Sequence, residues 1–286
     1  MSNRSPIDLR SVTLCAADSL NPRIALHALR RSAHLCTFGD VILFSHEDIP
    51  SDIRTVRIPQ LQSRDEYSAF IFKDLVHHIS TPWVLIAQWD GFVVDETAWS
   101  QSFLDYDYIG AKWPFHSDGL TVGNGGFSLR SARLLQACAE ARFPMIPGIN
   151  EDDLICRVYR SALETECGIR FAPEHIAERF SHERGALDNP TFGFHGAFNM
   201  WRHVDDAEMI EIIHAADPRT IPSIEMIQLL SAYFALRKFA CLKALYTRMR
   251  HAWTPLQIAE QIVRGGTSKE VAVQCVNTCD RLSRGS

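Results

Sequence analysis

The stretch Trp83-Val84-Leu85-Ile86-Ala87-Gln88-Trp89-Asp90-Gly91 decides the fold class of this chain. Its first five residues are continuously apolar, which is typical of a central strand covered on both faces in an α/β protein. The polar residues Gln88 and Asp90 follow at the carboxyl end of that strand, where open α/β sheets place their ligands. A carboxylate is a hard oxygen ligand for a divalent cation, and Gly91 lets the backbone approach a bound group closely. We therefore expect a ligand site at this edge of the sheet, with Asp90 as a candidate metal ligand.

Strand and helix patterns alternate on both sides of this stretch. Strands are expected at residues 11–16, 41–44, 55–58, 83–87, 108–111 and 169–172. Helices are expected after Asn21-Pro22, after Ser63, and over residues 96–104, 128–142 and 152–163. This alternation predicts an α/β, Rossmann-like domain over residues 8–204, with a mixed, mainly parallel sheet flanked by helices.

Beyond about Asp205 only helical patterns remain, which predicts an all-helical appendage over residues 205–286. Residues 221–246 and 254–264 read as helices, and Ser223 and Thr254 are candidate N-cap residues. One face of this appendage is mildly basic. Such a face is usually just solvated, and the alternative is a peripheral membrane or protein contact.

Composition narrows the class of protein. The chain has 286 residues, of which 46% are apolar and 22% charged, as in an ordinary globular protein. A net charge of -5 without a long basic stripe argues against a general nucleic-acid binder. The eight cysteines are scattered, most of them inside apolar patterns where a free thiol behaves as a small hydrophobe. With no signal-peptide core and no apolar run near ~20 residues, we expect a reduced, cytoplasmic protein.

A glycine-rich loop, Gly123-Asn124-Gly125-Gly126, precedes the next expected helix. The loop lacks the Lys-Ser/Thr end of a P-loop, and its spacing is not that of a dinucleotide fingerprint. Three glycines in four positions indicate that the backbone comes close to another group. That group is a sugar, a phosphate or simply the neighbouring strand.

Three consecutive acids, Glu151-Asp152-Asp153, follow Asn150 and open a helix. Acids in a first helical turn complement the helix dipole, so a structural role is one reading. Two carboxylates near one reacting hydroxyl are also the arrangement that general base catalysis needs, so a catalytic role is the other.

Two further polar residues stand near glycines or strand ends. Asp18 follows the first strand and is either a turn former or a contact to a nucleotide base or ribose. His195 lies between Phe194 and Gly196 and is either a packed histidine or a metal ligand that completes the site of Asp90.

Five motifs together resemble a family of bacterial domains thought to be glycosyltransferases. The motifs are Gln88-Trp89-Asp90-Gly91, Asp107-Tyr108-Ile109-Gly110-Ala111-x-Trp113-Pro114, Gly123-Asn124-Gly125-Gly126-Phe127-Ser128-Leu129-Arg130, Glu151-Asp152-Asp153 and Phe192-Gly193-Phe194-His195-Gly196. Their order is similar to that of inverting nucleotide-sugar transferases of the GT-A fold, such as the β-1,4-galactosyltransferases. Those enzymes carry an Asp-x-Asp, a Gly-Gly segment, a Glu-Asp-Asp run and a late metal-binding histidine. The resemblance covers roughly residues 10–203.

This resemblance implies a GT-A-like hexosyltransferase that moves a sugar from a nucleotide diphosphate sugar, first of all a UDP-sugar, to a hydroxyl of a glycan or of another acceptor. It implies inversion, Mn²⁺ or Mg²⁺ as the cofactor, and a place in cell-surface glycan synthesis. Asp90 and His195 would bind the metal, and Gln88 stands where the family has its first Asp.

The resemblance also implies roles for the other clusters. Asp152 would be the general base and Glu151 and Asp153 its neighbours, although which of the three acids is the base stays open. The donor would contact Asp18, Gln88, Asn124, Gly125 and Gly126.

Two other classes of protein remain open. A nucleotidyltransferase or sugar-phosphate enzyme on a related fold would need a basic residue near the glycine-rich loop, and Lys112 and Arg130 are the close candidates. A non-catalytic carbohydrate-binding or scaffold protein is the third class, because Gln88 replaces an acid.

Overall fold

A computed structural model describes residues 6–284 of the chain. Its internal contacts divide the chain into two compact units, residues 1–195 and residues 196–286. The first is called the α/β unit here and the second the helical unit, and each is described by itself.

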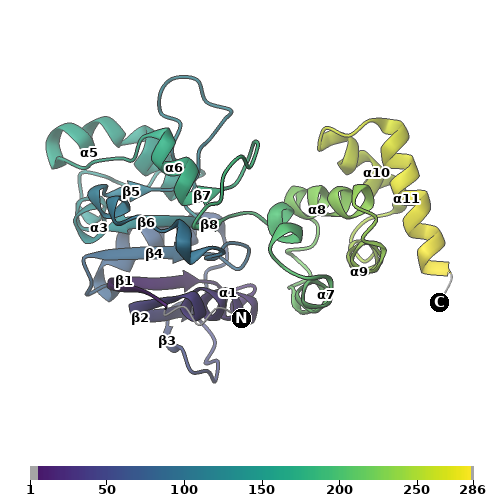
Figure 1. Ribbon diagram of the computed structural model, residues 1–286, viewed down its shortest axis with the longest axis horizontal. Coiled ribbons are helices and arrows are strands. Elements are labelled where there is room, and N and C mark those ends of the chain that lie inside the picture. Colours follow the sequence, from purple (N-terminus) through teal and green to yellow (C-terminus); the bar gives the residue numbers. More distant parts are fainter. Residues whose placement is uncertain (1–5, 285–286) are drawn as a thin grey trace. The chain divides into compact units, whose positions relative to one another are not determined.

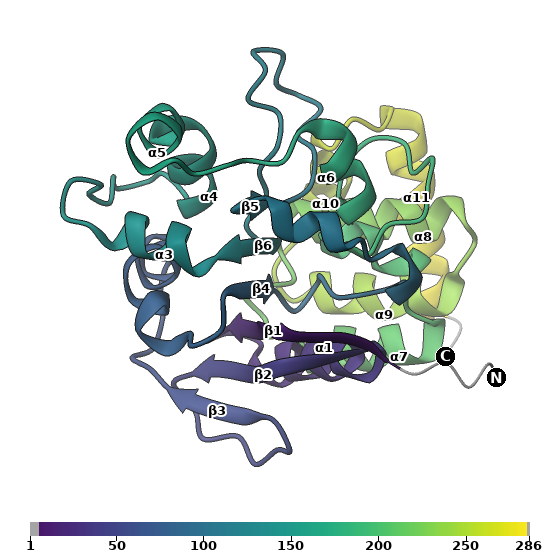
Figure 2. The same cartoon turned by 60° about the vertical axis from the view of Figure 1, so that its left-hand side comes forward.

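A six-stranded sheet forms the centre of the α/β unit (Figure 1). Its strands are β1 (Ile7–Ala17), β2 (Cys36–Ser45), β3 (Arg54–Arg57), β4 (Trp83–Ala87), β5 (Tyr108–Ile109) and β6 (Phe127–Ser131). Their order is β3-β2-β1-β4-β6-β5, which Figure 2 shows one strand below another from β5 to β3. The four strands β3, β2, β1 and β4 are mutually parallel, whereas β6 runs antiparallel to both β4 and β5. The predicted α/β class with a mixed, mainly parallel sheet is confirmed.

Helices cover both faces of this sheet. They are α1 (Pro22–Leu35), α2 (Arg64–Ala69) with its continuations η1 (Phe70–Asp74) and η2 (Leu75–His78), the short η3 (Glu96–Ala98) and η4 (Gln101–Asp105), α3 (Ala132–Ala139), α4 (Glu151–Asp153) with η5 (Leu154–Val158), α5 (Arg160–Cys167) and α6 (Glu174–Phe180). Alternation along β1 explains the two layers, because successive side chains of a strand point to opposite faces. Leu14 packs in the cluster that contains residues of α1 and α6, whereas Cys15 packs with residues of η1 and α3.

The structure corrects two of the expected elements. The helix expected over residues 128–142 begins only at Ala132, because Phe127–Ser131 pairs with β4 as a strand that is buried throughout. The strand expected at residues 169–172 is reduced to a single bridge between Phe171 and Tyr108. Near it, β7 (Ser181–His182) and β8 (Gly193–Phe194) form a second, two-stranded sheet.

The described part of the helical unit contains helices and no strand. Its elements are η6 (Ala197–Arg202), α7 (Asp206–Ala215), α8 (Ile224–Ala235), α9 (Phe239–Met249), α10 (Pro255–Arg264) and α11 (Lys269–Arg284). Ser223 and Thr254 accept hydrogen bonds from Met226 N and Gln257 N, which confirms them as N-caps. The sequence predicts a boundary between residues 204 and 205, whereas the contacts divide the chain after His195, because η6 packs against α8.

All eight cysteines are free thiols. Seven of them are buried, and only Cys167, at the end of α5, is partly exposed. Burial raises the pKa of the thiols of Cys15 and Cys138 to about 12. Between residues 6 and 284 no helix combines the length and the apolar character that crossing a membrane requires.

Candidate active site

Strand register brings two of the predicted clusters together. β4 and β6 are antiparallel, and Ala87 at the end of β4 lies opposite Phe127 at the start of β6. The residues that follow β4, Gln88 to Gly91, therefore lie beside the glycine-rich loop that precedes β6. The strand β8 reaches the same place, because Gly193 bridges to Val93.

His195 is at the centre of this cluster. Its Nε2 atom lies 3.1 Å from Oε1 of Gln88 and 3.5 Å from Oδ1 of Asp90. Its Nδ1 atom lies 3.3 Å from Oε1 of Glu183. Burial disfavours the charged imidazole, but the carboxylates of Asp90 and Glu183 outweigh it and raise the pKa of His195 to about 9. The two carboxylates therefore favour the protonated form of the ring.

Asn124 holds the glycine-rich loop against this histidine. Its backbone has a φ of 67°, a left-handed conformation that asparagine tolerates better than most residues. Its side-chain Oδ1 accepts a hydrogen bond of 3.3 Å from Phe127 N, and its Nδ2 lies 3.0 Å from Nδ1 of His195. The amide of Asn124 is thus engaged inside the protein.

Gly125 and Gly126 lie so close to other predicted site residues that only glycine fits at these two positions. A Cβ atom on Gly125 would lie 2.1 Å from Oε1 of Glu151, and one on Gly126 would lie 2.0 Å from Nε2 of His195. No side chain fits at such distances. The close neighbours that the glycine pattern predicts include the side chains of Glu151 and His195 themselves.

Glu151 is a buried partner of Arg130. Its Oε1 lies 3.0 Å from Nη2 of Arg130, and both side chains are almost fully buried. Ser68 Oγ donates to its Oε2 at 3.3 Å. Burial and the adjacent Asp152 raise the pKa of Glu151, while Arg130 opposes that shift. Glu151 is therefore tied into the interior beneath the site.

Asp152 is the member of the acidic run that joins the glycine-rich loop. Its Oδ2 accepts a hydrogen bond of 2.8 Å from Gly125 N, and its Oδ1 accepts one of 2.9 Å from Asp153 N. Its side chain is only partly buried. Burial and Asp152 raise the pKa of the neighbouring Asp153. Of the three acids, Asp152 therefore combines contact with the loop and access to solvent.

Asp18, at the end of β1, forms a turn. Its Oδ1 accepts hydrogen bonds from Leu20 N at 2.7 Å and from Asn21 N at 2.6 Å, which shapes the chain just before α1 begins. The turn-former reading accounts for these contacts.

Three residues of the cluster were not singled out from the sequence. Tyr67 accepts a hydrogen bond of 2.9 Å from Gln88 Nε2, Ser68 holds Glu151, and Glu183 contacts His195. Only the folded chain brings them near residues that are up to 83 positions away. No spacing in the sequence marks them.

The donor atoms around His195 suit a divalent cation only in part. Within residues 6–284 no group of three or more His, Cys, Asp and Glu side chains is arranged to hold a metal ion. An imidazole, one carboxylate and the amide oxygen of Gln88 converge instead. Neighbouring ligands on a Mg²⁺-sized cation lie about 3 Å apart, close to the 3.1 and 3.5 Å seen here. One negative charge is little for such a cation, so phosphates of a ligand would have to complete the site.

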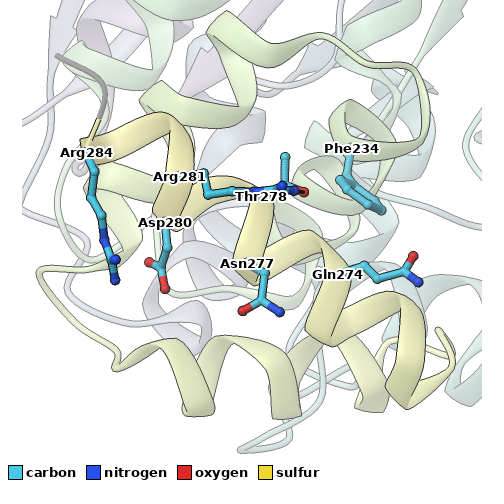
Figure 3. Close-up of a pocket in the computed structure, with 7 residues that line it drawn as sticks. All are labelled: Phe234, Gln274, Asn277, Thr278, Asp280, Arg281 and Arg284. Atoms are coloured by element: carbon cyan, nitrogen blue, oxygen red, sulfur yellow. Dashed lines mark hydrogen bonds between the residues drawn. The ribbon is translucent and has the colours of Figure 1, made fainter.

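A separate hollow lies in the helical unit (Figure 3). It encloses about 580 Å³ and is lined by Phe234, Gln274, Asn277, Thr278, Asp280, Arg281 and Arg284. Two of its charged groups have hydrogen-bond partners: Tyr246 Oη donates to Asp280 at 2.6 Å, and Arg281 donates to Thr278 at 3.2 Å. None of the predicted site residues lines it.

Fold and site together define an α/β protein with a polar cluster where its parallel strands end beside an antiparallel neighbour. The chain belongs to the family described as "Protein of unknown function (DUF5672)", which matches residues 51–195 and so ends at His195. No curated protein matches the chain.

Several solved structures are similar to the chain at low identity. A glycosyltransferase involved in the glycosylation of the major capsid of PBCV-1 is 13% identical, with 64% of this chain and 91% of that chain covered and a TM-score of 0.41. The mannosyltransferase PcManGT from Pyrobaculum calidifontis, in complex with GDP-Man and Mn²⁺, is 10% identical, with 99% and 89% covered and a TM-score of 0.41. The bifunctional IspDF from Campylobacter jejuni is 10% identical, with 90% and 89% covered and a TM-score of 0.39. Similarity at this level carries no argument about activity.

Proposed function

We propose that this protein is a glycosyltransferase that moves a sugar from a nucleotide diphosphate sugar to a hydroxyl group of a glycan. One observation carries the proposal. The glycine-rich loop contacts the candidate metal ligand His195 on one side and the candidate base Asp152 on the other. A donor and an acceptor could therefore meet along a single loop.

Asp90 and His195, together with Gln88, would hold Mn²⁺ or Mg²⁺. The cation would act as a Lewis acid and offset the charge that grows on the leaving diphosphate. Binding at Nε2 requires His195 to give up the proton on that atom, so the metal and a proton compete for it.

Asp152 would be the general base. A carboxylate that removes the proton of the acceptor hydroxyl, while that hydroxyl attacks from the face opposite the leaving group, inverts the anomeric centre. The hydrogen bond from Gly125 N aims one oxygen of Asp152 toward the loop. Glu151, buried in its pair with Arg130, would help to fix the position of the neighbouring Asp152. Asp153 would lie beside the acceptor.

The donor would lie along the loop and the end of β4. The backbone at Gly125 and Gly126 would face the sugar, with the amide of Gln88 and the carboxylate of Asp18 as further contacts. A UDP-sugar is the first donor to test.

The nucleotidyltransferase alternative needs a free basic group near the loop. Lys112 is paired with Glu174 at 2.8 Å and Glu178 at 2.9 Å, and Arg130 is buried against Glu151. Neither is placed to bind a triphosphate from solution, so we favour the glycosyltransferase.

The first experiment is a thermal-shift panel. It compares UDP, GDP, CDP and dTDP and their common sugar conjugates, each with and without Mn²⁺. A ligand present at 100 times its dissociation constant adds about 2.7 kcal/mol to the free energy of unfolding. We expect a manganese-dependent shift with one nucleotide family, abolished in Asp90→Ala and retained in Asp206→Ala, a matched change in the helical unit.

The absence of a shift with every nucleotide would contradict the proposal and leave the scaffold alternative. A shift that persists in Asp90→Ala would contradict the assignment of the metal site. Separation of the products of a positive reaction would then test inversion directly.

A further inference from the structure

His195 presents its two ring nitrogens to two different environments. Nε2 faces Gln88 and Asp90, and Nδ1 faces Glu183, whose Oε1 lies 3.3 Å away. Both members of this last pair are largely withdrawn from water, with side chains 16% and 13% exposed. Metal-binding histidines commonly donate their second N–H to a carboxylate, which fixes the tautomer and the orientation of the ring.

Glu183 is placed to accept the proton on Nδ1. Nδ2 of Asn124 also lies 3.0 Å from Nδ1, but an amide nitrogen is a donor without acceptor capacity. The orientation of this amide is fixed by its oxygen, which accepts from Phe127 N. The side chain of Asn124 is also among the neighbours that lower the pKa of Glu183, as a hydrogen-bond donor to its carboxylate does. Asn124 therefore lies beside both members of the pair of Glu183 and His195 and helps to orient the carboxylate of Glu183.

The backbone geometry of Asn124 fits this role. Its φ of 67° costs conformational free energy for any residue with a Cβ atom. In that conformation the side chain reaches Glu183 and His195, while the backbone carbonyl accepts a hydrogen bond of 3.1 Å from Tyr108 Oη. A glycine would adopt the same φ without this cost but would lack the side-chain amide.

We propose that Glu183 is a positioning residue of the metal site: it accepts the Nδ1 proton of His195 and keeps Nε2 directed at Gln88 and Asp90, with Asn124 holding Glu183 in place. This inference rests on the proposed function, because it gives Nε2 a metal to bind. A purely structural role would be to neutralise a buried imidazolium. If Glu183 is a positioning residue, its substitution weakens the affinity for a cation. If its role is purely structural, the affinity is unchanged.

The test measures Mn²⁺ affinity by electron paramagnetic resonance, from the signal of free Mn²⁺, alone and with UDP or GDP. The proteins are the wild type, Glu183→Ala, Glu183→Gln and the control Glu174→Ala. Glu174 is a carboxylate of the same unit that pairs with Lys112, away from His195. We expect Glu183→Ala to weaken Mn²⁺ binding 10–100-fold. Glu183→Gln, which retains an acceptor oxygen, should lose less, and Glu174→Ala should bind like the wild type.

The outcomes separate this inference from the proposed function. If the wild type binds no Mn²⁺ under any of these conditions, the metal-assisted function is wrong and the role of Glu183 falls with it. If the wild type binds Mn²⁺ and both Glu183 variants bind it equally well, only the inference is overturned. If Glu183→Ala does not fold, Glu183→Gln decides, because it preserves the shape of the side chain: unchanged affinity overturns the inference and weakened affinity supports it.

Discussion

An ion pair in the α/β unit and one in the helical unit differ in how deeply they are buried. In the α/β unit, Arg130 and Glu151 form an ion pair whose side chains are 0% and 4% exposed. In the helical unit, Lys238 and Asp206 form one whose side chains are 27% and 47% exposed. Burying a pair of charges is costly, and apolar residues of similar volume are often at least as stabilising. We therefore explain the buried pair of Arg130 and Glu151 by its position beside Asp152 rather than by a contribution to stability.

The largest expected effect tests whether function belongs to the α/β unit alone. We expect Asp152→Asn to lower the rate of donor turnover by roughly 10²–10⁴-fold, the usual contribution of a general base. Donor binding should persist, because the amide keeps the shape of the side chain. Asp280→Asn, in the hollow of the helical unit, should leave turnover unchanged. Release of nucleotide from the donor identified by the thermal-shift panel measures both, and an equal loss in the two variants would break the comparison.

The next effect is on stability. Arg130→Met should cost about 3–5 kcal/mol, because it leaves Glu151 buried without its partner. Lys238→Met should cost about 0–1 kcal/mol, as expected for an exposed pair. Hydrogen exchange measured by mass spectrometry resolves the two units, and we expect protection to fall within residues 6–195 of Arg130→Met. Equal costs would show that Arg130 and Glu151 are not coupled as described.

Glycines allow a third comparison. We expect Gly126→Ala to cost about 1–3 kcal/mol through overpacking, because its Cβ would lie 2.0 Å from Nε2 of His195. Gly265, at the end of α10, has a φ of -72°. A Cβ atom on Gly265 would have its nearest neighbour at 3.3 Å. Gly265→Ala should therefore change stability by less than about 1 kcal/mol. Urea denaturation checks both, and Gly126→Ala should also weaken Mn²⁺ binding.

The smallest effect is a pH dependence. Burial alone would raise the pKa of Asp107, but hydrogen bonds from Arg133, Ser131 and Arg170 N hold it below its usual range. A depressed pKa gives stability that is present above the unfolded pKa of about 3.9 and is lost as the pH falls through the folded value. Asp107→Asn should therefore lose stability at pH 7 and little at pH 3.

Asp217 in the helical unit provides the counterpart. A hydrogen bond from Arg219, which is 63% exposed, lowers the pKa of Asp217. Because solvent screens this pair, Asp217→Asn should change the pH dependence less than Asp107→Asn does. Urea midpoints at the two pH values compare them, and a larger effect for Asp217 would contradict the assignment.

Features that depend on a local sequence pattern could be predicted, whereas features that depend on contacts between distant residues could not. β4 is predictable because a fully buried strand is continuously apolar. The alternating apolar and polar residues of β6 are typical of a strand, but β6 runs directly into α3, and a helical pattern that extends back to Ser128 conceals it. The burial of Arg130 could not be predicted either, because no local pattern reveals the position of its partner Glu151. The edge rule for α/β sheets predicts a ligand site at Asp90, and the structure brings Asp90 close to His195. Glu183 reaches His195 only through the pairing of β7 with β8, which no spacing in the sequence indicates.

The uneven burial of the thiols offers a practical route to studying this protein. Seven cysteines are shielded from solvent, and only Cys167 is partly open to it. Thiol reagents attack the accessible thiolate, so an electrophilic dye or spin label should attach at Cys167 alone in the folded chain. The natural sequence thus provides a single reporter position in the α/β unit. A second reporter introduced into the helical unit would measure how far apart the two units stay in solution, and whether a nucleotide sugar changes that distance.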